Sequence, residues 1–178
     1  MRDLCRVAVL SLGLPFAAAP ILAEEIAGSR FTAGAFWQGS AETGDDGQFL
    51  YCSVSIIHGE GQQLWFLLRR DDRFLILLTT SAHSFTPGTA FESGLGINGG
   101  PVSAFRADAL DANTMAMSFP DIAHAIRTMR QSDTLTIMVS PTFALTVGTP
   151  EIAAALDAAK ACLDANVAPG TGPGATSP

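Results

Sequence analysis

The chain has 178 residues, of which 48% are hydrophobic and 15% charged, and its ten basic and seventeen acidic residues give a formal net charge of −7. An acidic chain with scattered basic residues is poorly suited to neutralising a phosphate backbone, so the sequence argues against a nucleic-acid partner. The same charge disfavours an anionic membrane surface. It favours solubility instead.

The first 23 residues have the pattern of a secretory signal peptide. Arg2 and Arg6 precede the apolar run VAVLSLGLPFAAAPILA, and Glu24 follows Ala23, after which we predict cleavage, with Ala19 as the alternative. A membrane anchor is the other interpretation, but the run is short and contains two prolines, whereas a spanning helix needs about 20 continuous apolar residues. We therefore expect a periplasmic or secreted protein with no membrane span after cleavage. Processing leaves eight basic and sixteen acidic residues, a net charge of −8.

Three apolar runs follow, each separated from the next by a short turn. They are QFLYCSVSII (48–57), QLWFLLR (63–69) and RFLILLTT (73–80). Strands joined by such turns predict an antiparallel meander. Because LWFLL and FLILL are apolar at every position, we expect these strands to be covered on both faces.

A glycine-rich stretch, GLGING at 94–99, matches the G-x-G-x-x-G pattern of dinucleotide-binding loops. That pattern requires a helix immediately afterwards, so that free backbone N–H groups point at the pyrophosphate. Pro101 and Val102 favour extended chain here instead, and Asn98-Gly99 is a strong signal for a tight hairpin turn. The stretch therefore predicts a β-hairpin, and we expect no nucleotide or other cofactor.

The second half of the chain contains two predicted helices and a hairpin. In the first helix, SFPDIAHAIRTMRQ, we expect Ser118 to cap the N-terminus. The strands TLTIMVS (134–140) and TFALTVG (142–148) follow. In the second helix we expect Thr149 to act as the cap, with Pro150 in the first turn. An apolar stripe then runs along that helix through Ile152, Leu156, Ala159 and Leu163.

These elements together predict one mainly β domain over residues 24–167, with an antiparallel sheet or sandwich-like arrangement and two helices, in the α+β class. The final segment APGTGPGATSP (168–178) has no large apolar side chain to bury, so we expect a disordered tail.

Two cysteines remain after removal of Cys5 with the leader. In an oxidising compartment Cys52 and Cys162 are expected to form one disulfide, with Cys162 beside the apolar stripe of the last helix. The alternative, a metal-binding or redox-active pair, would need a C-x-x-C spacing or a histidine cluster, and neither is present. We expect no metal site.

The FLYC strand and the segment FALTVGTPEIAAALDAAKAC resemble the small secreted envelope proteins of the invasion-associated locus B family, over roughly residues 34–163. The resemblance implies a β-rich periplasmic or surface protein with no established catalytic residues. It also implies that Cys52 and Cys162 are the family's disulfide pair. Lys160 is the only lysine of the processed chain, which departs from the basic character expected of such a member and argues against a role in host contact.

The chain has three histidines that could act in catalysis. His58 lies in a predicted turn without a second metal ligand, and His124 lies in the first turns of a predicted helix, where a hydrogen bond along the helix explains it. His83 lies between Ser81 and Ser84, so a hydrolase that uses a Ser/His pair in the 81–88 loop stays open. No G-x-S-x-G motif accompanies it.

The expected function is a non-catalytic binding or inhibitory module of the cell envelope, whose partner is another envelope or extracellular protein. Its candidate binding residues are Trp37, His83, Phe85 and Phe91, because these side chains border predicted turns or loops and aromatic side chains often anchor protein interfaces. The alternatives are a structural accessory subunit of an envelope complex and the hydrolase.

Overall fold

The computed structural model describes residues 23–59 and 61–167. The predicted signal peptide, except Ala23, and the predicted tail at 168–178 lie outside these residues. The strands are β1 (Glu24–Glu25), β2 (Phe31–Ala33), β3 (Trp37–Thr43), β4 (Phe49–His58), β5 (Gln62–Arg69), β6 (Phe74–Thr80), β7 (Ala90–Ile97), β8 (Ser103–Ala109), β9 (Thr114–Phe119), β10 (Thr134–Ser140) and β11 (Phe143–Gly148). The helices are α1 (Ile122–Met129) and α2 (Ile152–Val167).

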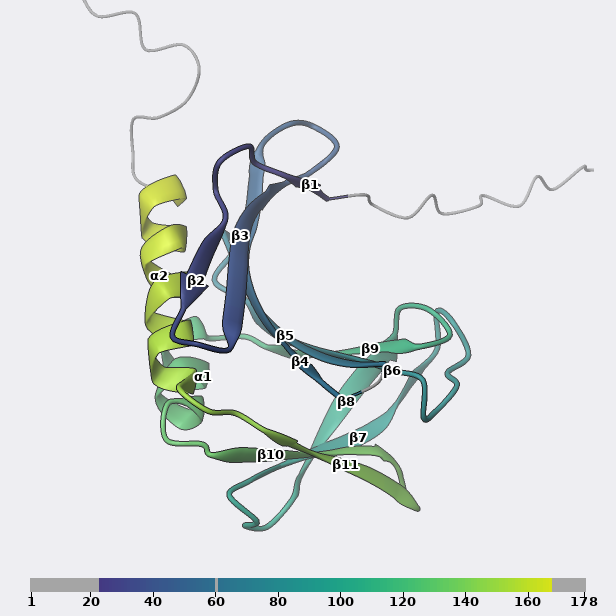
Figure 1. The fold of residues 1–178 in the computed structure, drawn as a ribbon. Helices are drawn as coiled ribbons and strands as arrows, with labels where there is room; N and C mark the ends of the chain where they lie inside the picture. Colours follow the sequence, from purple (N-terminus) through teal and green to yellow (C-terminus); the bar gives the residue numbers. More distant parts are fainter. Residues whose placement is uncertain (1–22, 60, 168–178) are drawn as a thin grey trace, which may run out of the picture.

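All the strands belong to one antiparallel sheet, in the order β1-β3-β4-β5-β6-β9-β8-β7-β10-β11, with β2 paired to β3. The sheet curls, so that β4, β5, β6 and β9 lie above β7, β10 and β11, while α2 stands against β2 and β3 at one side (Figure 1). The predicted meander is confirmed as β4-β5-β6, and the predicted pair 134–140 and 142–148 as β10-β11. The mainly β, single-domain prediction is confirmed.

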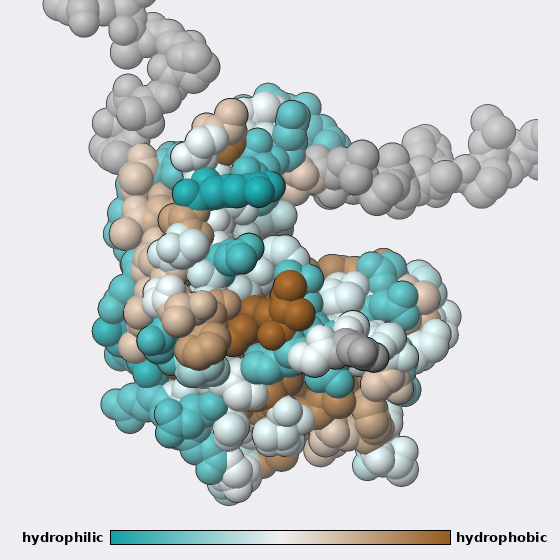
Figure 2. Space-filling model, viewed as in Figure 1, coloured by the Kyte–Doolittle hydropathy of each residue, from teal (hydrophilic) through white to brown (hydrophobic). Residues whose placement is uncertain are grey.

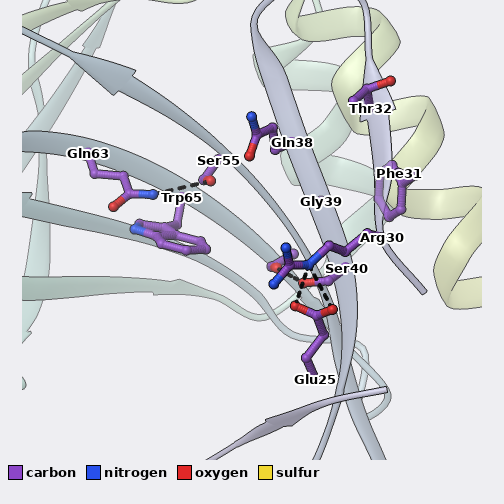
Figure 3. Close-up of a pocket in the computed structure, with 11 residues that line it drawn as sticks. Glu25, Arg30, Phe31, Thr32, Gln38, Gly39, Ser40, Ser55, Gln63 and Trp65 are labelled. Carbon is purple, nitrogen blue, oxygen red and sulfur yellow. Dashed lines mark hydrogen bonds and ion pairs between the residues drawn. The ribbon is translucent and has the colours of Figure 1, made fainter. Parts of the chain in front are cut away.

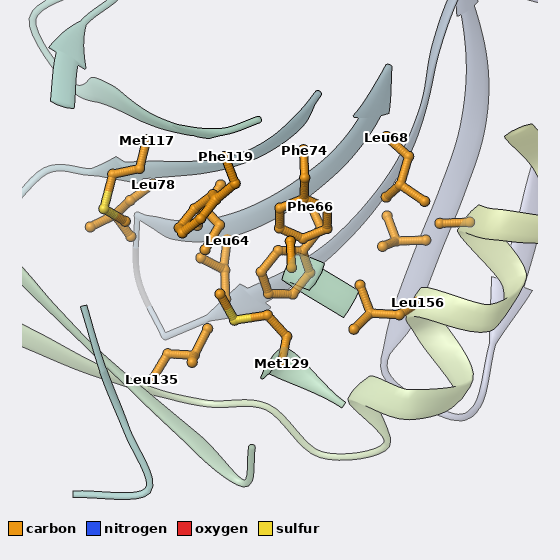
Figure 4. Close-up of a cluster of buried hydrophobic side chains, with 14 of the residues drawn as sticks. Leu64, Phe66, Leu68, Phe74, Leu78, Met117, Phe119, Met129, Leu135 and Leu156 are labelled. Atoms are coloured by element: carbon orange, nitrogen blue, oxygen red, sulfur yellow. The ribbon is translucent and has the colours of Figure 1, made fainter. Parts of the chain in front are cut away.

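The core fills the inside of the curl. Along β5 the side chains of Leu64, Phe66 and Leu68 point inward and are completely buried. The Phe66 ring stacks on Trp37 on one side and on Phe74 on the other, at centroid distances of 5.5 and 5.6 Å. Figure 4 shows the β5 side chains in one cluster with methionines and leucines from other strands and from both helices. The inner face is therefore the hydrophobic face of every central strand.

No described element covers the outer face of the meander, so the expectation that these strands are packed on both faces is wrong. Trp65, Leu75 and Leu77 point outward and are only half-buried. They shield one another across the strands, because Leu77 lies opposite Trp65 and Leu75 lies opposite Leu67. Cross-strand contact of this kind explains how a strand can be apolar at every position without a second layer above it.

Helix α2 packs on the inner side of the sheet and is joined to it by the Cys52–Cys162 disulfide. The predicted apolar stripe is confirmed: Ile152, Leu156, Ala159 and Leu163 are all buried. The two half-cystines are 110 residues apart in sequence, so the bond connects β4 near the start of the domain to the last helix.

Neither predicted helix cap is correct. The Thr149 side chain is buried and needs a hydrogen-bond partner. Its hydroxyl donates to the Ser132 carbonyl at 2.8 Å, in a neighbouring segment, instead of capping α2. Ser118 lies in β9, and α1 is capped by Asp121, whose carboxylate accepts a hydrogen bond from the His124 backbone N–H at 2.8 Å. In both cases the tertiary environment decides which side chain is available.

The glycine-rich stretch is a hairpin between β7 and β8, as predicted. Asn98 and Gly99 have φ values of 51° and 69°, and the Gly100 N–H donates to the Ile97 carbonyl at 2.8 Å, which fits a tight turn with two left-handed residues. A Cβ on Gly94 would lie 2.5 Å from a Val102 methyl carbon, so the absence of a side chain at Gly94 leaves room for Val102 to pack against β7.

The first prediction concerns the cysteines. Because Cys52 and Cys162 are bonded to each other, the chain processed after Ala23 should contain no free thiol. Titration with a thiol reagent in denaturant should detect none before reduction and two after it. The chain-entropy treatment gives roughly 4 to 5 kcal/mol as the upper limit of the stability lost on reduction. Two reactive thiols before reduction would contradict the assignment.

The second prediction concerns the hairpin. Gly99→Ala should lower the free energy of unfolding by about 1 kcal/mol or more, because Cβ disfavours the left-handed conformation of this residue. Gly148→Ala is a matched control, since a Cβ there meets only a His58 ring carbon at 3.8 Å. Millimolar NAD or ATP should not change the melting temperature. A nucleotide-dependent increase would refute the hairpin interpretation of GLGING.

Candidate functional site

The predicted residues His83, Phe85 and Phe91 meet beside the β6–β7 loop. The Phe85 and Phe91 rings stack at 5.6 Å, and the His83 ring contacts Phe85 edge-on at 4.9 Å. Phe143, which begins β11, joins them by stacking on His83 at 5.9 Å. We call these four side chains the aromatic cluster. A pocket of about 480 Å³ lies beside it and is lined partly by hydroxyl-bearing residues of the loop.

The fourth predicted binding residue, Trp37, lies elsewhere. Its side chain is in the core with 1% of its surface exposed, and its indole N–H donates to the Pro150 carbonyl at 2.6 Å. The sequence placed Trp37 beside a turn because strand β3 was not predicted. Since β3 directs this ring inward, Trp37 connects the sheet to the start of α2 and offers no surface for a partner.

The geometry of the 81–88 loop gives no activated nucleophile. The His83 ring packs against Phe85 and Phe143, and no hydrogen bond joins it to Ser81, Ser84 or any other described residue. A nucleophilic serine needs a base within hydrogen-bonding distance. As it stands, the loop presents aromatic surface with hydroxyl groups around it.

A second candidate site, which sequence reasoning missed, lies on the outer face of β3, β4 and β5. Its lining includes Gln38, Ser53, Ser55, Gln63 and Trp65, and its volume is about 520 Å³. We call it the outer groove. In the sheet register Gln38 lies opposite Ser55, and Ser55 lies opposite Trp65, so three neighbouring strands contribute side chains to one row. Figure 2, which has the same view as Figure 1, shows a hollow between the upper part of the molecule, formed by β1–β3, and the lower right part, where β6 and β9 lie.

Short hydroxyl side chains form the floor of the outer groove. Ser53 is 2% exposed, and its hydroxyl lies 3.4 Å from that of Ser40, which in turn donates to a Glu42 carboxylate oxygen at 2.6 Å. On the other side, the Gln63 amide donates to the Ser55 hydroxyl at 3.3 Å. Figure 3 shows Gln63, Ser55 and Trp65 grouped on one side, with Arg30, Ser40 and Glu25 on the other.

The charges around the outer groove neutralise each other. The Arg30 guanidinium donates to the Glu25 carboxylate at 2.8 Å, and these are the only charged side chains that line the groove among the described residues. Tyr51 lies on β4 outside the groove. Burial raises the pKa of Tyr51 to about 12, and Glu42 adds to the increase, so this phenol is neutral at physiological pH.

A smaller pocket of about 480 Å³ continues the outer groove and shares Gln38, Ser55 and Gln63 with it. Phe36 and Ile57 border this pocket and are 55% and 72% exposed. His58, at the end of β4 and not in a turn, is also part of its lining. The His58 Nε2 atom is inaccessible to solvent and has no described hydrogen-bond partner.

One feature of the sequence points to the outer groove. In β4, Cys52, Val54 and Ile56 alternate with Ser53 and Ser55, which is the pattern of a strand with one buried and one polar face. The runs LWFLL and FLILL in the next two strands do not alternate in this way, so they do not indicate a polar outer face. The described ranges contain no group of three His, Cys, Asp or Glu side chains placed to hold a metal ion. Neither described helix has the length and apolar character needed to cross a membrane.

Comparison of the chain with protein-family models, curated proteins and solved structures gave no match.

The third prediction concerns His58. Burial lowers the pKa of His58 below its usual value of 6.5, while a hydrogen bond with the Gly148 backbone opposes the shift. The folded state therefore binds fewer protons than the unfolded state below that pH. The His58 contribution to stability should be complete above about pH 6.5 and should decrease as the pH falls through the lowered pKa.

Proton NMR of the His58 ring tests this, with the urea-unfolded chain as the control for the unfolded midpoint. We expect a lower midpoint in the folded chain, and His58→Gln should reduce the loss of stability in acid. A folded midpoint equal to or above the unfolded one would show that the ring is not desolvated.

Proposed function

We propose that this chain is an exported recognition module that binds another envelope or extracellular protein through the aromatic cluster. The observation that carries the proposal is the convergence of His83, Phe85 and Phe91 with Phe143, a residue more than 50 positions away in sequence. Aromatic side chains held by one another provide contact area at a low cost in conformational entropy, as in the anchor residues of protein interfaces.

The packing of the cluster supports a binding role. Phe85 is 7% exposed and holds the loop against the core, while His83, Phe91 and Phe143 are half-buried and keep part of their surface accessible. Thr86, Thr89 and Ser140 line the adjoining pocket. An aromatic centre with a polar rim is the usual composition of a protein interface.

Export is supported by two features. The N-terminal sequence has the pattern of a signal peptide, and the Cys52–Cys162 bond is of the kind that persists in oxidising compartments. The resemblance to the invasion-associated locus B family points to the same location. A role as a structural accessory subunit would use the same surface with a permanent partner.

The fourth prediction tests the aromatic cluster. Wild-type protein and His83→Ala are immobilised and exposed to a periplasmic or secreted extract from the source cells, and bound proteins are cross-linked and identified. We expect one discrete partner on the wild type and a loss of about tenfold or more in its binding to His83→Ala, the size of a hot-spot effect.

His124→Ala is the matched control, because this histidine is exposed on α1 and is not part of the cluster. It should retain the partner in full, and both variants should melt at the wild-type temperature. If His83→Ala and Phe143→Ala retain the partner as well as the control does, the aromatic cluster is not the binding surface.

A further inference from the structure

We propose that the outer groove binds a neutral oligosaccharide. This proposal concerns a different surface from the aromatic cluster and does not rest on the proposed function. The groove is open along the outer face of β3–β5, and with a volume of about 520 Å³ it lies within the usual size range of small-molecule sites. Because it continues into the pocket bordered by Phe36 and Ile57, it can hold an extended chain and not only a single compact ligand.

The polar atoms of the groove match the hydroxyl groups of a sugar. No hydrogen bond joins the Gln38 amide to another described residue, and Gln63 uses only its NH₂ group, leaving Oε1 without a described partner. Each amide carries both donors and an acceptor, and each serine hydroxyl does the same. A pyranose ring, whose neighbouring hydroxyls also donate and accept, can satisfy such groups without any charge.

Trp65 supplies the apolar part of this recognition. Its half-buried indole lies in one row between Ser55 on β4 and Leu77 on β6, next to the amide of Gln63 (Figure 3). The C–H face of a sugar ring is apolar, and an indole offers a flat apolar surface of similar size with a polar edge. Stacking on Trp65 would therefore place the sugar hydroxyls near Gln63 and Ser55.

Electrostatics favour a neutral ligand. Arg30 and Glu25 line the groove as an ion pair, so their charges sum to zero and the groove presents no net positive charge to a phosphate, sulfate or uronic acid. The processed chain also carries a net charge of −8, which disfavours the approach of any anion.

The sheet itself argues against an extended peptide as the ligand. Peptides that bind along a sheet add a strand to a free edge and use its backbone N–H and C=O groups. Strand β3 already pairs with β2 and β4, β4 pairs with β3 and β5, and β5 pairs with β4 and β6. The groove therefore has no free strand edge to which a peptide could add, whereas an oligosaccharide can bind through the side chains that line it.

The fifth prediction uses the two tryptophans of the chain. Trp37 is buried in the core, so a ligand in the outer groove should change only the fluorescence of Trp65. Chitotetraose, cellotetraose and maltotetraose are titrated into the processed protein to millimolar concentration. We expect at least one of them to shift the emission in a saturable way, and trigalacturonic acid, an anionic oligosaccharide, to leave it unchanged.

Calorimetry on variants locates the site. Trp65→Ala and Gln63→Ala should each weaken binding by about tenfold or more, while Trp65→Phe should keep part of the affinity because it retains an aromatic face. Gln48→Ala is the matched control, since this exposed glutamine bonds Arg70 outside the groove and should leave affinity unchanged. Trp37 fluorescence and the melting temperature verify that each variant is folded.

Three outcomes would overturn the proposal. The first is the absence of a saturable change with any of the three neutral sugars. The second is sugar binding that survives both Trp65→Ala and Gln63→Ala. The third is that no sugar binds while a random peptide mixture does, and that these two variants abolish the peptide binding. The third would assign the groove to peptides. None of these results would bear on His83 or on the aromatic cluster.

Discussion

The packing of α2 against the inner face of β3–β5 is the constraint on which the rest of the structure depends. The buried stripe of α2 meets strands at one end of the sheet, and the disulfide from Cys162 reaches β4 at Cys52, whose side chain points inward. Once Cys52 points inward, the pleat directs Val54 and Ile56 to the core and Ser53 and Ser55 to the outside. The same helix thus defines both the hydrophobic face and the polar face of the sheet.

The start of α2 also connects distant parts of the chain. Trp37 donates to Pro150, and the backbone N–H of Ala35 donates to the Glu151 carboxylate at 2.7 Å, so the β2–β3 turn is fixed to the beginning of the helix. Next to this point, the Thr149 N–H donates to the Asp133 carbonyl at 2.8 Å, and the Asp133 N–H donates to the Asn98 side chain at 2.6 Å, which ties the β7–β8 turn to the same region. The β2–β3 turn and the β7–β8 turn, which are far apart in sequence, are thereby both connected to the beginning of α2.

The two candidate sites differ in how they are built. The aromatic cluster is assembled from a loop, from β7 and from the beginning of β11, and its side chains hold one another in place. The outer groove belongs to three adjacent strands, and the register of the sheet positions its side chains. A surface of the first kind offers preorganised aromatic contact area, which suits a protein partner, whereas one of the second kind presents groups at strand spacing, which suits a repeating ligand.

The sequence by itself determined the meander, the β7–β8 hairpin, the stripe of α2 and the cysteine pair, because each rests on local periodicity, on turn chemistry or on the compartment. Only the tertiary structure decided that β3 turns Trp37 inward, that Thr149 bonds Ser132 instead of its own helix, and that the outer leucines of β6 have no layer above them. It likewise decided that Gln38, Ser55 and Trp65 share one row, since this depends on the pairing of strands separated by turns. Local patterns specify which residues are apolar or polar, but the face on which each one lies follows from long-range pairing and from what the helices cover.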